Sequence, residues 1–346
     1  MADFRSAVRR RTPALLAAAF LLTCGSILSR AAIQVQTLRA TASLPPSMSG
    51  QFRNPLAFQR AADGGYYVFD QRGHSVYRID PAMEHATRIV SIGAETGRLL
   101  QPTAFASEPG GTFAVADAPQ QERIQVFADQ GTLIGGFFPS GASRFQVVLD
   151  GLVLGGVGSL QYDGHSILIS EPSTGTLITA YSPYGDLRRS FGRLRETGQT
   201  DPDLQTVLNT GLPLFNPQGG YDFVFQTGRP LFRRYDRDGH LLFERHIEGR
   251  EIDDLIARLP TAWPKRPPGS HEFPIAHPIV RTAAIDRQGN LWVALVVPYI
   301  YVYDADGDKV RVVQLRTAEG PLAATSLFFD PQGRLLVTPG CFVFTP

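Results

Sequence analysis

Three acidic residues hold matching places along the chain, each at the end of a short apolar segment. Asp70 ends "YYVFD", Asp117 ends "TFAVAD" and Glu171 ends "SILISE". If these segments are strands of neighbouring sheets, their carboxylates could form part of a ring that suits a hard cation such as Ca²⁺. Acidic side chains at strand ends also accept hydrogen bonds from their own loops. This structural role is the stronger expectation, since the corresponding later places hold Gln226, Leu295 and Thr338.

Other side chains suited to binding lie in the segments that follow these and equivalent strands. They are Arg72, His74, Gln121, Glu122, Arg229, His277 and Tyr299. Our leading hypothesis is a non-catalytic binding module that engages a peptide, glycan or protein partner, with no cofactor. The alternative is a metal-dependent hydrolase or lyase, in which Asp70, Asp117, Glu171 and His277 hold Ca²⁺ or Zn²⁺.

Common catalytic motifs do not account for the chain. In "HEFPIAH" the two histidines lie six residues apart, and Pro274 breaks the helix that a zinc protease motif requires. "DADGD" at 304 lacks the downstream Glu of a calcium loop and stands where a hairpin turn is expected. We find no G-x-S-x-G elbow, glycine-rich phosphate loop or C-x-x-C pair.

The elements that must position these residues repeat along the chain. Turn signals such as "EPGG" at 108, "DRQGN" at 286 and "DPQGR" at 330 precede a strand, a loop and a second strand. Each copy fits four short antiparallel strands, and there are six copies. Repeats of four strands arranged radially form a β-propeller.

The last copy is one strand short, because it ends at "CFVFTP". A strand-like segment at 33–40 could supply the missing outer strand and close the ring. The sequence therefore predicts an all-β fold: a six-bladed β-propeller of four-stranded antiparallel blades, with the ring closed by an N-terminal strand. We expect it to form a single domain over 32–346.

The stretch "QPTAFASEPGGTFAVADAPQQERIQVFADQGTLIGGF" resembles an NHL repeat, and the chain after residue 31 is similar to six-bladed propellers of the NHL-like exported bacterial type. The resemblance implies the propeller fold. It leaves function open, because members include binding modules, metal-dependent lactonases and lyases.

Residues 1–31 have the pattern of a signal peptide: arginines, a short apolar run, then small residues on both sides of Arg30. Cys24 leaves a lipoprotein signal open, although Thr23 precedes it where such signals have Gly, Ala or Ser. We expect an extracytoplasmic protein, held at a membrane only through an N-terminal anchor if at all.

Without residues 1–31 the net charge of the chain changes from +1 to −3, which disfavours nucleic-acid binding. A monomer is expected.

Long connections should all lie on one face of the ring, opposite the short turns. The longest covers 248–278, and Asp201 with Pro202 predicts a short capped helix in another. Long connections in compact domains are often functional. We expect the ligand on this loop-rich face, over the central channel.

Overall fold

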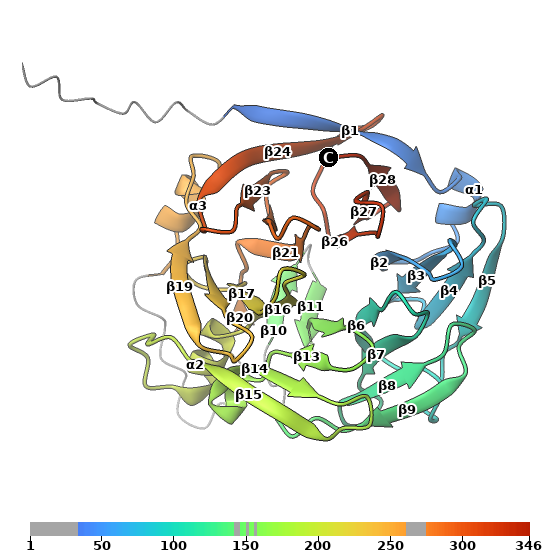
Figure 1. The fold of residues 1–346 in the computed structure, drawn as a ribbon, viewed down its shortest axis with the longest axis horizontal. Helices are drawn as coiled ribbons and strands as arrows, with labels where there is room; N and C mark the ends of the chain where they lie inside the picture. Colours follow the sequence, from blue (N-terminus) through green and yellow to red (C-terminus); the bar gives the residue numbers. More distant parts are fainter. Residues whose placement is uncertain (1–33, 142–145, 150–151, 156–157, 261–274) are drawn as a thin grey trace, which may run out of the picture. The chain divides into compact units, whose positions relative to one another are not determined.

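The strands occur in groups of four that follow one another along the chain (Figure 1). This computed structural model describes residues 34–346 except 142–145, 150–151, 156–157 and 261–274. The predicted signal peptide, including Cys24, lies outside the described residues. From Ile33 onward the chain is one compact unit. No helix in the described part is long and apolar enough to serve as a membrane span.

Five groups are complete within consecutive sequence, and we number them as blades 1 to 5. Blade 1 contains β2 (Pro55–Arg60), β3 (Tyr66–Asp70), β4 (Ser75–Ile79) and β5 (Ala86–Val90). Blade 2 contains β6 (Pro102–Ser107), β7 (Phe113–Asp117), β8 (Arg123–Phe127) and β9 (Leu133–Phe137). Blade 3 contains β12 (Leu160–Tyr162), β13 (Ile167–Ile169), β14 (Thr176–Tyr181) and β15 (Leu187–Arg193).

Blade 4 contains β16 (Gly211–Phe215), β17 (Tyr221–Phe225), β18 (Leu231–Tyr235) and β19 (Leu241–His246). Blade 5 contains β21 (Val280–Ile285), β22 (Leu291–Leu295), β23 (Ile300–Tyr303) and β24 (Lys309–Thr317). Blade 6 has β26 (Ser326–Phe329), β27 (Leu335–Thr338) and β28 (Phe342–Phe344), and β1 (Val35–Ser43) completes it from the other end of the chain. The fold is a six-bladed β-propeller, as predicted.

The closing strand β1 does more than replace a missing strand. Its second half pairs antiparallel with β28, from Ala40 opposite Phe344 to Ser43 opposite Phe342. Its first half pairs in parallel with β24, from Val35 opposite Val312 onward. One strand therefore joins the outer edges of blades 5 and 6 into a continuous sheet, and both edges lose their exposed backbone groups.

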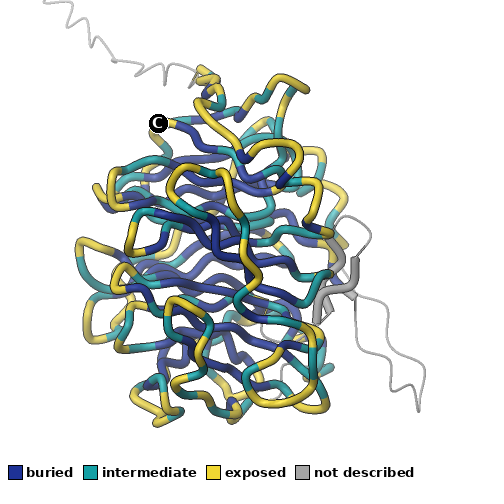
Figure 2. Tube along the Cα trace, turned by 90° about the vertical axis from the view of Figure 1, so that its right-hand side faces the viewer, coloured by how far each residue is buried: buried dark blue, intermediate teal, exposed yellow. Residues whose placement is uncertain are grey.

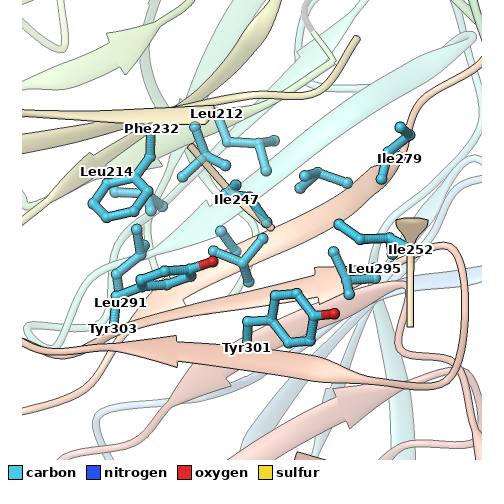
Figure 3. Packing of buried hydrophobic residues seen from close by; sticks show 14 of the residues in the cluster. Leu212, Leu214, Phe232, Ile247, Ile252, Ile279, Leu291, Leu295, Tyr301 and Tyr303 are labelled. Atoms are coloured by element: carbon cyan, nitrogen blue, oxygen red, sulfur yellow. The ribbon is translucent and has the colours of Figure 1, made fainter. Parts of the chain in front are cut away.

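Packing between blades forms the core. The middle strands are buried on both faces because each blade lies between two others, as the dark blue strands in Figure 2 show. Between blades 4 and 5, Ile247 and Ile252 from the following connection pack with Phe232, Leu291 and Tyr303 (Figure 3). Removing a buried side chain of this size typically costs about 2–5 kcal/mol.

The repeated Asp-x-x-Gly signals are hairpin turns on one face, which we call the turn face. In the turn at 286, Asp286 accepts hydrogen bonds from the backbone nitrogens of Gln288 (3.0 Å) and Asn290 (2.9 Å). Gly289 has φ +84°, a left-handed conformation that glycine adopts without steric cost. The turn sequence thus follows from the turn geometry.

The long connections lie on the opposite face, which we call the loop face. Beside α1 (Pro46–Ser49), η1 (Pro172–Thr174), α3 (Asp253–Ala257) and β25 (Gly320–Leu322), they hold a small sheet of β10 (Gln146–Leu149), β11 (Leu152–Gly155) and β20 (Ile275–Ala276). The predicted capped helix is α2 (Pro202–Leu208). The Asp201 side chain accepts from the backbone nitrogens of Asp203 and Leu204, which confirms the predicted cap.

Candidate functional site

The acidic residue of blade 2 joins two parts of its own blade. The Asp117 side chain is fully buried, and its two oxygens accept from Arg123 Nε (2.8 Å) and a second guanidinium nitrogen (2.9 Å). It also accepts from the backbone nitrogen of Leu100 (3.0 Å), in the connection that enters the blade, and from Gln125 Nε2 (3.2 Å). This bidentate ion pair compensates the buried charge of the Asp117 carboxylate, which burial would otherwise penalise.

Asp70 and Glu171 play the same part in blades 1 and 3. Asp70 accepts from the backbone nitrogens of Arg53 (2.9 Å) and Asn54 (2.8 Å), in the connection that enters blade 1. Glu171 accepts from the backbone nitrogen of Gly141 (2.8 Å) and from the Tyr181 hydroxyl (2.8 Å). Burial raises the pKa of Tyr181, and the Glu171 carboxylate adds to this effect. The three carboxylates are buried inside separate blades and do not meet around the channel.

The other predicted residues lie on the loop face without converging. Arg72, Gln121, Arg229 and His277 are exposed, and His74, Glu122 and Tyr299 are half-buried. Arg229 is 3.6 Å from Glu248, and both side chains are more than 60% exposed, so this ion pair adds little stability.

None of the ten predicted site residues lines the cavity that the structure forms in the central channel.

That cavity has a volume of about 190 Å³ and lies where all six blades meet. Its walls come from the innermost strands β2, β6, β12, β16, β21 and β26, which surround the centre of the ring in Figure 1. Asn54, Gln71 and Gln226, which lie at the loop-face ends of their blades, also line it. It is smaller than the roughly 300–1,000 Å³ typical of sites for drug-sized ligands.

Five carboxamides and five hydroxyls, together with Arg281, make up the polar side chains of the described residues that line this channel cavity. Gln59 Oε1 accepts from the Ser107 nitrogen (2.7 Å) and hydroxyl (2.9 Å). Asn54 Nδ2 donates to Gln71 Oε1 (3.0 Å), and Gln226 Nε2 donates to the Arg281 carbonyl (3.1 Å). Within the described part of the chain, each bond uses one end of a carboxamide and leaves the other end for a bound molecule.

Two more features define the chemistry of the cavity. The Gln161 carboxamide makes no hydrogen bond to a described residue. Arg281 is the one charged residue among the described residues that line the cavity, and no Asp, Glu, His or Cys is among them. These neutral donors beside an arginine do not fit Ca²⁺ or Zn²⁺, which need carboxylate, imidazole or thiolate ligands to offset their charge.

Two turns on the turn face do bring acids and a histidine together. Asp80, Glu84 and His85 form one group, and Asp236, Asp238 and His240 the other. In the second, Asp236 accepts from the His240 backbone nitrogen (2.8 Å) and lies 3.2 Å from His240 Nδ1. Asn290 holds the same place relative to Asp286 in blade 5, so the histidine is one variant of a structural turn.

Sequence reasoning missed the channel carboxamides. Gln59 and Gln161 are polar positions in otherwise apolar innermost strands, and this was the available signal. The acids that we singled out are more conspicuous in the sequence, but their charges are already compensated within their blades.

Comparison with known proteins identifies the fold. No family model and no curated protein matches the chain. A solved structure from Xanthomonas campestris, described as a gluconolactonase important in glucose secondary metabolic pathways, is 14% identical with a TM-score of 0.50 and covers 91% of this chain and 98% of its own. The fold is shared with this six-bladed propeller.

Two further solved structures are virginiamycin B lyase from Staphylococcus aureus, each 10% identical to this chain. The selenomethionine form has a TM-score of 0.47 and covers 82% of this chain and 77% of its own. A catalytically inactive variant with quinupristin has a TM-score of 0.49 and covers 85% and 84%.

Proposed function

We propose that this chain is a binding protein whose channel cavity takes a small, uncharged, hydroxyl-rich ligand such as a monosaccharide or the terminal residue of a glycan. The observation that carries the proposal is a set of carboxamides from different blades that line one cavity. Each of those bonded in the structure uses only its oxygen or its nitrogen in a hydrogen bond. A carboxamide both donates and accepts, as a sugar hydroxyl does, so the two can pair in several geometries. Among the peptide, glycan and protein partners left open by the sequence, the glycan fits this lining best.

The absence of acids among the described lining residues disfavours a cationic ligand. Arg281 is compatible with a neutral or negatively charged one. The modest volume limits what enters to about one sugar ring, while the loop face offers contacts to the remainder of a larger glycan.

Titration calorimetry of the intact protein with a panel of monosaccharides and short glycans tests this proposal. We expect saturable binding of at least one of them, and about a tenfold loss of affinity in Gln161→Leu and Gln226→Leu. Gln121→Leu is the matched control, because Gln121 is exposed outside the cavity. Equal losses in all three variants, or no binding across the panel, would overturn the proposal.

The enzymatic alternative has one supporting observation, the shared propeller fold with a protein described as a gluconolactonase. It would use Asp70, Asp117, Glu171 and His277 as metal ligands, but the three carboxylates are buried and bonded within their blades. Elemental analysis of purified protein, followed by lactone hydrolysis with and without chelator, tests it directly. A stoichiometric metal together with chelator-sensitive turnover would favour this alternative over the binding proposal.

We also propose that the protein is exported and works as a monomer, in keeping with the signal-like residues 1–31 and the NHL-like repeat. The N-terminal sequence of protein purified from the producing cell tests export. A mature chain that begins near Ala32 supports cleavage, whereas lipid on Cys24 supports an anchored form. An unprocessed N-terminus would contradict both.

A further inference from the structure

A cavity of about 900 Å³ lies away from the channel. It opens at the rim between blades 3 and 4, and we call it the rim groove. One wall is the end of β15 with the residues that follow it, from Arg193 to Thr197, and the other is formed by β18 and β19. Leu259 and Pro260, which follow α3, close its loop-face end. None of these residues belongs to the channel cavity.

Two arginines of the groove lie within cation–π distance of the same aromatic ring. The guanidinium carbons of Arg195 and Arg233 lie 4.6 Å and 5.3 Å from the centre of the Phe225 ring. Arg233 is paired with Glu244 at 2.6 Å. Arg195 has no carboxylate partner among the described residues, since its donors go to the backbone carbonyls of Arg229 (2.8 Å), Leu208 and Thr227.

Within the described part of the chain, the guanidinium of Arg195 therefore bonds only to backbone carbonyls. It lies close to the positive charge of Arg233, and Glu244 favours its charged form only from a distance. Burial lowers the pKa of Arg195 to about 10, and the neighbouring Arg233 adds to this effect. Arg195 is still protonated at neutral pH. Of the other arginines in the lining, Arg193 pairs with Glu196 (2.7 Å), Arg229 with Glu248 (3.6 Å) and Arg233 with Glu244, so the charge of Arg195 is the one in excess among the described residues. An anion in the groove would relieve it.

Tyr235 provides an independent sign of a ligand. Its side chain lines the groove, and the residue is only 2% exposed. The hydroxyl lies beside Arg233, but no atom of the described residues meets the geometry of a hydrogen bond with it. Burial raises the pKa of Tyr235, so the hydroxyl keeps its proton and remains a donor. A buried polar group without a partner costs about 1–3 kcal/mol, which a ligand acceptor would recover.

The rest of the lining is apolar. It includes Leu194, Leu208, Leu231, Leu241 and Ile256, and Leu241 is 52% exposed. A small inorganic anion would leave this surface in contact with water. A ligand with an apolar body would cover it, and each buried methylene group is worth about 0.8 kcal/mol.

We propose that the rim groove binds an amphipathic organic anion, with its acidic head beside Arg195, Arg233 and Tyr235 and its apolar body along the leucines. The proposal rests on the convergence of an arginine without a carboxylate partner, a buried hydroxyl without a hydrogen bond and an apolar lining on one cavity. It concerns a second site and does not depend on what the channel cavity binds.

Two detergents with the same tail and opposite charge test the proposal on the full chain. Below their micellar concentrations, dodecanoate should bind saturably, and dodecyltrimethylammonium should bind at least tenfold more weakly. Binding of both with equal affinity would show that the groove selects only apolar surface, which overturns the proposal. Absence of saturable dodecanoate binding would overturn it as well.

Variants locate the site. Tyr235→Phe keeps the ring, whose centre lies 5.5 Å from that of Phe191, and removes only the hydroxyl. We expect it and Arg233→Gln each to weaken dodecanoate binding about tenfold. Arg245→Gln is the matched control, because Arg245 is an exposed arginine of β19 outside the groove. A loss in the control as large as in the two variants would contradict the assignment. Thermal unfolding of every variant checks that the fold is retained.

Discussion

The strand-end carboxylates and the channel carboxamides are close neighbours with opposite roles. Asp70 and Asp117 carry formal charge and are buried, with their oxygens bonded inside their own blades. Gln161 and Gln226 are uncharged and line the cavity where the blades meet. In this propeller, buried carboxylates join loops to blades, whereas we propose that the neutral carboxamides contact a ligand. The cause is that a buried charge must be compensated locally, whereas a carboxamide tolerates a partly satisfied position.

The largest effect should come from Asp117→Ala. The change leaves the guanidinium of Arg123 buried without its carboxylate and the Leu100 nitrogen without an acceptor. We expect the free energy of unfolding to fall by about 3–5 kcal/mol, measured by urea denaturation. The double variant Asp117→Ala with Arg123→Met should be less destabilised than the single one, since no charge is then left unpaired. Affinity for the channel ligand, per folded molecule, should not change.

A smaller effect is expected for Glu171→Gln, because the side chain of Glu171 has a hydroxyl and a backbone nitrogen as partners among the described residues, and no cation among them. Glutamine keeps the size of the side chain but weakens both bonds. The free energy of unfolding should fall by about 1–3 kcal/mol. A loss as large as that of Asp117→Ala would show that hydrogen bonds, and not charge pairing, dominate these joints.

The fold was predictable because its signals are local. The Asp-x-x-Gly turns, the short apolar strands and the Asp201 cap each depend on residues close in sequence, and all appear in the structure. The ring closure was predictable in part. A strand at the N-terminus could be read from composition, but its parallel pairing with β24 depends on where blade 5 ends in space.

The sites were less predictable because their residues are far apart in sequence. The channel cavity combines positions such as Gln59, Gln161 and Gln226, and no single stretch contains them. The rim groove depends on how blades 3 and 4 diverge and on the side-chain positions of Arg195 and Tyr235. The sequence showed where strands end, and this favoured the acids that the structure buries.

Blade 6 offers a buried group that lacks the compensation of Asp117. Burial raises the pKa of the Cys341 thiol to about 12. Because the folded pKa lies above that of the unfolded chain, the unfolded state loses its proton first as pH rises above about 9. The Cys341 contribution to stability is therefore complete at pH 7 and falls between about pH 9 and 12, at up to about 1.4 kcal/mol per pH unit.

The comparison of wild type with Cys341→Ser isolates this effect. Urea denaturation at pH 8, 9, 10 and 10.5 should show a shallower alkaline decline in the serine variant, since its hydroxyl does not ionise in this range. Other ionising groups, such as Tyr67, whose pKa burial raises to about 12, contribute equally to both chains. Parallel curves for the two proteins would contradict the prediction.

The smallest effect on stability should come from a residue whose replacement is expected to weaken binding strongly. Gln161 is half-exposed, and its carboxamide bonds to no described residue, so Gln161→Leu breaks no hydrogen bond within the described part of the chain. The free energy of unfolding should change by no more than about 0.5 kcal/mol, while sugar affinity falls about tenfold. Asp117→Ala should show the reverse pattern, with a large loss of stability and unchanged affinity. If Gln161→Leu instead destabilised the fold and left binding intact, the carboxamides would share the structural role of the acids, and the division between scaffold and site would fail.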